Sequence, residues 1–286
     1  MTTTQGTVTR LPVPPAPHAQ LPVGSVDVLP SLAAALWPRR CAVQGDIEAI
    51  SFAELDRRIS RLAAGLRDLL GGEGSVVAVS SVLSLEFPVV YYAIARSGNV
   101  VAPVNPRIGA QVLEPLLTTL GARAVVLSRA QYDRARPLLA RLPLEQVLLL
   151  DGPSAPGVPT CAEVARRGNL LVEPRDRNEN ELASILLGAG RAGYVRSARQ
   201  SHHTLKVDAA KTGATHGLSE AAITLNTLPS YHQVHLNAAV WAGATQVLCA
   251  SPDLAVQAGV AERFDPTHMY TLAPDRRMLA RTAVAS

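Results

Sequence analysis

Lysine is almost missing from this chain, although basic residues are common in it. Of the 27 lysine and arginine residues, only Lys206 and Lys211 are lysines, and the arginines are scattered along the sequence. The formal charge of +4 therefore arises without the basic run that is typical of nucleic-acid-binding arms. We expect no nucleic-acid partner.

Cysteine is also scarce. The three cysteines, Cys41, Cys161 and Cys249, lie far apart, are odd in number and form no CxxC pair. This spacing argues against a disulfide framework and indicates isolated buried thiols in a reducing compartment.

Long hydrophobic runs are absent as well. The longest apolar stretch, residues 76–95, contains three serines, a glutamate and a proline, so it is predicted to be a strand followed by a helix. Residues 1–24 are rich in proline and threonine and lack the apolar segment of a signal peptide. We expect a cytoplasmic protein without membrane contact, whose residues 1–24 form a disordered tail.

The chain is rich in short apolar segments that alternate in type. Hydrophobic residues make up 48% of its 286 residues, enough for a sizeable core. Strands are expected at 76–79, 100–104, 124–127, 146–150, 182–187, 222–225, 246–249 and 269–272, after a small hairpin at 41–52. Helical spacing is found at 31–37, 52–70, 85–96, 110–120, 130–142, 201–215, 231–241, 254–263 and 275–284. This alternation predicts an α/β fold of mostly parallel sheets covered by helices on both faces.

A connector divides the alternating pattern into two parts. Residues 151–180 contain proline, glycine and a charged run, and the strand–helix alternation resumes after them. We therefore expect two βα lobes, residues 25–165 and residues 166–286.

The stretch LLGAGRAGYVRSARQSHHTL, residues 186–205, is expected to organise the second lobe. It places Gly188, Gly190 and Gly193 between a predicted strand and a helix that begins at Ser201. A glycine-rich turn between a strand and a helix can expose backbone N–H groups to a phosphate. Hydroxyls and a lysine usually complete such a site, and here the hydroxyls are nearly absent and the lysine is missing.

Several segments in a fixed order carry a family resemblance. SFAELDRRISRLAAGLRDL looks like a "T-Y-x-E-L" helix, and FPVVYYAIARSGNVVAPVNPRI looks like a segment ending in "P-x-N-P". LNTLPSYHQVHLNAAVWAGATQVL is similar to "L-P-x-x-H-x-x-G-L" followed by "G-A-x-x-V-L". Together they resemble the adenylate-forming superfamily: acyl-CoA synthetases, aryl-CoA ligases and peptide-synthetase adenylation domains. The resemblance covers about residues 27–283 and implies the fold of the N-terminal domain of those enzymes.

The glycine-rich stretch aligns with the superfamily's phosphate loop, "Y-T-S-G-T-T-G-x-P-K-G-V-x-x-T-H". Gly190 and Gly193 are kept, Arg191 replaces a threonine and Arg196 stands at the lysine position. Four hydroxyls are lost, each of which could contribute about 1.5–3 kcal/mol to holding a phosphate. We therefore expect neither ATP nor magnesium to be used. The two glycines and two arginines remain candidates for binding a substrate anion.

The resemblance also implies parts that do not follow in this sequence. Adenylate-forming enzymes continue with an aromatic–Gly–Thr–Glu motif, a ribose-binding aspartate and a C-terminal domain that carries a catalytic lysine. None of these follows Thr271, so we expect a truncated, N-terminal member.

The resemblance places His232 at the position of the acyl-pocket histidine, where it could act as acid or base. Tyr231 and Asn237 belong to the same segment, and His235 lies one helical turn on, so all three are expected to contact substrate. A His-x-x-His pair can bind zinc, but no third ligand stands at a fixed spacing, so no metal is expected.

These features leave three hypotheses. The first is a non-canonical enzyme of bacterial specialised metabolism that acts without ATP on an acyl or aryl acid, a thioester or a carrier-bound intermediate, with His232 as acid or base. The second is an inactive module that binds a partner or carrier protein. The third is half of a split acyl-CoA ligase, against which the lost hydroxyls argue. Missing family parts should leave an apolar face, so a homodimer or a partner protein is also expected.

Overall fold

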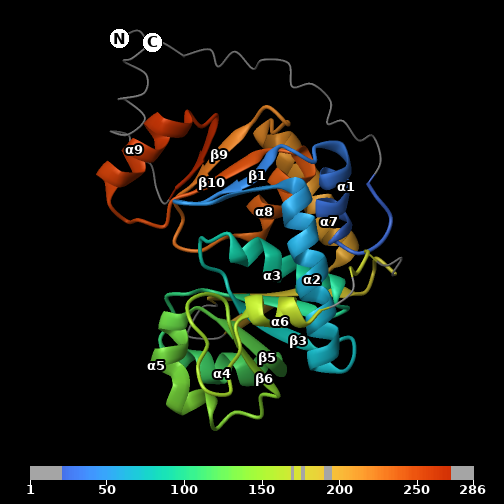
Figure 1. Ribbon diagram of the computed structural model, residues 1–286, viewed down its shortest axis with the longest axis vertical. Coiled ribbons are helices and arrows are strands. Elements are labelled where there is room, and N and C mark those ends of the chain that lie inside the picture. The colour runs from blue at the N-terminus through green and yellow to red at the C-terminus, as the bar shows by residue number, and fades with distance from the viewer. Residues whose placement is uncertain (1–20, 169–170, 175–177, 190–194, 272–286) are drawn as a thin grey trace, which may run out of the picture.

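The computed structural model describes residues 21–168, 171–174, 178–189 and 195–271. Two β-sheets stack in this part of the chain, with helices between them and on their outer faces (Figure 1). The expected α/β class, with mostly parallel sheets covered on both faces, is confirmed. The predicted helix at 275–284 and most of the predicted tail lie outside the described residues.

The strands are short, and several of the buried ones, such as β3 and β4, are rich in valine. They are β1 (Cys41–Gln44), β2 (Ala49–Ser51), β3 (Val76–Ser80), β4 (Val100–Val104), β5 (Ala122–Leu127), β6 (Gln146–Leu149), β7 (Leu182–Ala189), β8 (Val195–Ser201), β9 (Ile223–Asn226), β10 (Thr245–Leu248) and β11 (His268–Tyr270). The helices are α1 (Val28–Leu36), α2 (Phe52–Leu70), α3 (Glu86–Arg96), α4 (Ala110–Leu120), α5 (Arg129–Leu139), α6 (Cys161–Arg167), α7 (His202–His216), α8 (Gln233–Ala242) and α9 (Leu254–Phe264).

Each sheet takes strands from both of the expected lobes. The six-stranded sheet has the order β6-β5-β3-β4-β7-β8, and the five-stranded sheet has the order β11-β9-β10-β1-β2. All neighbours are parallel except β7 with β8 and β1 with β2. The expected boundary at residue 165 therefore does not separate one sheet from the other, and a division of the chain into domains there stays a prediction.

The glycine-rich stretch does not lead directly from a strand into a helix, as we expected. Residues 195–201 form β8, which runs antiparallel to β7 with Leu187 opposite Ser197. Ser197, Ala198 and Arg199 are exposed, so β8 is an edge strand held by backbone pairing. An edge strand without apolar alternation gives little sequence signal, which explains the wrong prediction.

The apolar core lies between the two sheets and between each sheet and the helices on its outer face. The largest apolar cluster contains Phe52 of α2, Tyr91 of α3 and Leu236 of α8, and it lies between the sheets. Helices α4 and α5 cover the outer face of the six-stranded sheet, and Ala261 of α9 packs on the five-stranded one. This sandwich fixes α3 and α8 against each other, and these two helices position the site described below (Figure 1).

Local capping explains where two of these helices begin. The Ser51 side chain accepts the Glu54 N–H at the start of α2, as the S-x-x-E pattern predicts. At α6, a helix inside the connector that we did not predict, Thr160 and Glu163 form a full reciprocal capping box. Its seven residues are too few to show helical periodicity, although its T-x-x-E signal is present.

The start of the described chain is tied to α7. Lys206 is fully buried, and its ammonium donates to the carbonyls of Pro22 and Gly24 at 2.6 and 2.7 Å and to Glu179 at 2.7 Å. The His202 ring accepts from the N–H of Val26 at 3.0 Å. Residues 22–24 were expected to belong to a disordered tail, and these bonds explain why they instead take a defined path.

Candidate functional site

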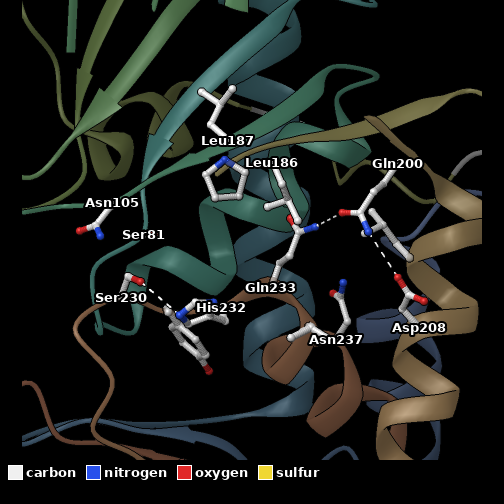
Figure 2. Close-up of a pocket in the computed structure, with 14 residues that line it drawn as sticks. Ser81, Asn105, Leu186, Leu187, Gln200, Asp208, Ser230, His232, Gln233 and Asn237 are labelled. Carbon is white, nitrogen blue, oxygen red and sulfur yellow. Dashed lines mark hydrogen bonds between the residues drawn. The ribbon is translucent and has the colours of Figure 1, made fainter. Parts of the chain in front are cut away.

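A pocket of 220 Å³ lies where β3 and β4 end, beneath β7 and β8 and beside α7 and α8. Ligands commonly bind beyond the carboxyl ends of parallel strands because the loops diverge there. Its lining comes from these ends, the β7–β8 hairpin, the first two turns of α7 and α8 and the segment before α8: Ser81, Pro103, Asn105, Leu186, Leu187, Gln200, Leu205, Asp208, Ser230, Tyr231, His232, Gln233, Val234 and Asn237 (Figure 2).

One wall of the pocket is a continuous row of hydrogen bonds. The Asp208 carboxylate accepts from Gln200 Nε2 at 3.3 Å, and Gln200 Oε1 accepts from Gln233 Nε2 at 2.6 Å (Figure 2). Gln233 Oε1 in turn accepts from the buried Ser184 hydroxyl at 2.9 Å. A carboxylate can only accept, so Asp208 fixes the orientation of both amides. The polar groups of this wall are therefore held in a single orientation towards a bound substrate.

His232 lies at the start of α8, where its backbone is extended and its ring reaches the pocket. Its Nε2 is 3.5 Å from the Ser230 hydroxyl, the limit of a hydrogen bond (Figure 2). Partial burial lowers the pKa of the His232 imidazole below its usual 6.5, so the ring is neutral at pH 7. A neutral imidazole can accept a proton, the role that the sequence predicted.

Tyr231 and Asn237 border the pocket, but their polar atoms are used in the core. The Tyr231 hydroxyl donates to Gln246 at 2.6 Å, and burial raises the pKa of this phenol strongly. Asn237 accepts from the Tyr92 hydroxyl at 2.8 Å and donates to that of Tyr91 at 3.1 Å. These bonds tie α8 to α3, so both residues contribute rigid walls rather than free polar groups.

His235 points away from the pocket and is not part of its lining. Its ring stacks on Tyr270 with a centroid separation of 3.9 Å and lies 6.3 Å from the His216 ring. Burial, with His232 and His216 nearby, lowers the pKa of His235 to about 4. The histidines thus meet at the β11 side of α8, but the described residues contain no group of three or more His, Cys, Asp or Glu placed to hold a metal ion.

The predicted loop residues Gly190, Arg191 and Gly193 lie outside the described residues. Arg196 is described only by its backbone, which pairs with Gly188 near the end of the hairpin. Their expected role in anion binding stays a prediction.

Several pocket residues were not predicted from the sequence. Gln200 and Gln233 face each other only because β8 returns antiparallel to β7, which the sequence did not indicate. Asp208 has no recognisable motif around it. Asn105 lies in the "P-x-N-P" segment, so the resemblance alone could have suggested it.

Comparisons with known proteins give a consistent result. The family model described as AMP-binding enzyme matches residues 31–284. A curated relative, the salicyl-AMP ligase / salicyl-S-ArCP synthetase of Mycobacterium tuberculosis, is 27% identical over 85% of this chain and 46% of its own length. This chain spans less than half of that relative.

Solved structures share the fold. A long-chain-fatty-acid-CoA ligase from Archaeoglobus fulgidus superposes with a TM-score of 0.82 at 21% identity, covering 94% of this chain and 56% of that one. MbtA from Mycobacterium smegmatis gives a TM-score of 0.79 at 25% identity, covering 87% and 48%. No helix in the described residues is long and apolar enough to span a membrane.

Proposed function

Since this chain belongs to the AMP-binding enzyme family, we propose that its pocket takes an acyl or aryl group and that the chain acts on this group without ATP. The substrate classes are an organic acid, a thioester and a carrier-bound intermediate. Among these a thioester fits best, because its acyl carbon is already activated and needs no adenylation.

The position of His232 carries this proposal. Its ring borders a pocket with apolar and hydrogen-bonding walls, whereas the aligned phosphate-loop sequence has lost four hydroxyls. For a thioester, water would attack the acyl carbon as the C–S bond breaks. His232 would take the proton from water and return it to the leaving thiolate. The products would be a carboxylic acid and a free thiol.

The lining supports an acyl or aryl group of modest size. Leu186, Leu187, Leu205 and Val234 supply apolar surface, and the Gln233–Gln200–Asp208 wall supplies hydrogen-bonding groups. The relative from M. tuberculosis is named for a salicyl-S-ArCP product, which favours an aryl group carried as a thioester. A carrier-protein partner for this chain belongs to the same proposal.

Calorimetry tests the loss of ATP use. The purified chain is titrated with ATP and magnesium at millimolar concentration, and we expect no saturable heat. Saturable binding would contradict the ATP-independent proposal and would leave phosphate binding to Arg191, Arg196 and the glycine backbone.

Turnover tests the role of His232. Acyl and aryl thioesters of N-acetylcysteamine are assayed by thiol release with the wild type and with His232→Ala. We expect a loss of about 10²–10⁴-fold, the usual contribution of general acid–base catalysis. The matched control is His203→Ala, because His203 is exposed at the outer side of α7 and bonds to Glu179. Equal turnover in wild type and His232→Ala would overturn the assignment, and no turnover in the wild type would favour the inactive binding module.

A further inference from the structure

A second hollow lies on the helical side of the molecule, between α2, α3 and α6. Its volume is 700 Å³, within the 300–1,000 Å³ range of small-molecule sites. It shares no lining residue with the His232 pocket. We call it the arginine groove.

The groove exists because α6 packs closely along one side of α2. A Cβ atom on Gly65 would lie 2.4 Å from the carbonyl oxygen of Val164, so only glycine permits this approach. The contact sets α6 beside α2 and leaves the neighbouring turns of both helices to face α3 across the hollow.

The floor of the groove is apolar and its rim is basic. Leu62, Val89 and Ala165 contribute to the floor, one from each of the three helices. The charged lining residues are four arginines and two glutamates, which leaves a formal charge of +2.

Two of the rim arginines are free to meet a ligand. Arg57 and Arg58 are both paired with Glu54, and Arg58 is also paired with Glu48. Arg61 is exposed, and no described residue forms a hydrogen bond or ion pair with its side chain. Arg166 is also exposed, on the facing helix α6, and Glu163 of the same helix acts on it electrostatically.

We propose that the arginine groove binds an amphipathic organic anion, with its apolar chain on the floor and its carboxylate or phosphate head between Arg61 and Arg166. Guanidinium groups bind both kinds of head through paired hydrogen bonds, and long arginine side chains can cover an apolar chain while their charged ends stay in water. A neutral ligand would leave the basic rim unmatched, and a cation would be repelled by it. This proposal is independent of the chemistry at His232.

Calorimetric titration with decanoate and decyl phosphate, below their micelle concentrations, tests the proposal on the full chain. We expect saturable binding, and at least tenfold weaker binding by Arg61→Ala/Arg166→Ala. Decanol and decyltrimethylammonium, which share the chain but lack the anionic head, should bind at least tenfold more weakly than the anions. The ratio between decanoate and decyl phosphate then identifies the preferred head.

Two control variants make the outcome specific. Arg134→Ala/Arg136→Ala removes the same charge from exposed positions on α5 and should bind like the wild type. Val234→Trp fills the His232 pocket and should also leave binding at the groove unchanged. The proposal is overturned if the wild type shows no saturable binding, if the two double variants lose affinity equally, or if Val234→Trp abolishes the signal. Failure of the thioester assay has no bearing on any of these results.

Discussion

The His232 pocket and the arginine groove use different helices and treat their polar side chains in opposite ways. At the pocket, nearly every polar side chain already has a protein partner, as in the row from Ser184 through Gln233 and Gln200 to Asp208. At the groove, Arg61 and Arg166 extend from helix surfaces into solvent. Helix α3 serves both, because Tyr91 and Tyr92 support the pocket and Val89 lines the groove.

This contrast separates the effects of mutation on stability and on binding. Polar groups buried at the pocket are costly to leave unsatisfied, so changes there should lower stability. Exposed arginines at the groove contribute little to stability because water screens their ion pairs. Removing a polar side chain should therefore lower the unfolding free energy at the His232 pocket but mainly weaken ligand binding at the arginine groove.

The largest effect is expected for Asn237→Leu. This change leaves the buried hydroxyls of Tyr91 and Tyr92 without their shared partner, and we expect the free energy of unfolding to fall by about 2–4 kcal/mol. Urea unfolding measures it, with the exposed Asn180→Leu as control. A loss below about 0.5 kcal/mol would remove the contrast, since the pocket wall would then tolerate unsatisfied groups.

Gly65→Ala should cause the next largest loss of unfolding free energy. The new methyl group would meet Val164 at 2.4 Å, so α6 must shift and we expect a loss of about 1–3 kcal/mol despite the better helix propensity of alanine. Gly259→Ala in α9 is the matched control, because nothing lies within 4 Å of its Cβ, and it should stabilise by about 0.5–1 kcal/mol. Equal effects of the two changes would show that α6 is not held closely on α2.

His235 should make a smaller contribution to stability, which is visible when the unfolding free energy is measured against pH. Its folded-state pKa of about 4 lies below the usual 6.5, so the unfolded chain binds the proton more readily. This contribution is fully present above pH 6.5 and is lost as the pH falls towards 4. After allowance for the hydrated part of the ring, we expect about 1–2 kcal/mol. His235→Phe should keep the stacking on Tyr270 and flatten this slope, and an unchanged slope would contradict the assignment.

The smallest effect is expected for Arg57→Ala at the groove. Its ion pair with Glu54 is exposed, so we expect a change in unfolding free energy below about 0.5 kcal/mol. A loss above about 1 kcal/mol, measured by the same urea method, would mean that the rim stabilises the fold. The pocket and the groove would then no longer differ in how their polar residues contribute to stability.

The sequence predicted most of the fold because its central strands are buried and apolar. Val76–Ser80 and Val100–Val104 are valine-rich strands, and α2 carries a capping signal and regular leucine spacing. It did not predict β8, which is a polar edge strand, or α6, which is a short helix whose position depends on Gly65. Tertiary pairing determines both elements.

The site was predicted only as far as the resemblance reached. His232, Tyr231 and Asn237 were expected together and do border one pocket. His235, one turn on, was expected beside them, but α8 turns its ring towards Tyr270 instead. Gln200 and Asp208 could not be predicted, because their contact depends on how β8 meets α7.

Because the ammonium of Lys206 is buried, its reactivity can report when the start of the described chain opens. Only two lysines are present, and Lys211 is exposed while Lys206 is enclosed by the carbonyls of Pro22 and Gly24. An amine-reactive reagent should therefore modify Lys211 at once and Lys206 only when residues 22–26 detach from α7. Mass spectrometry of the labelled peptides would then time that opening step without any engineered probe.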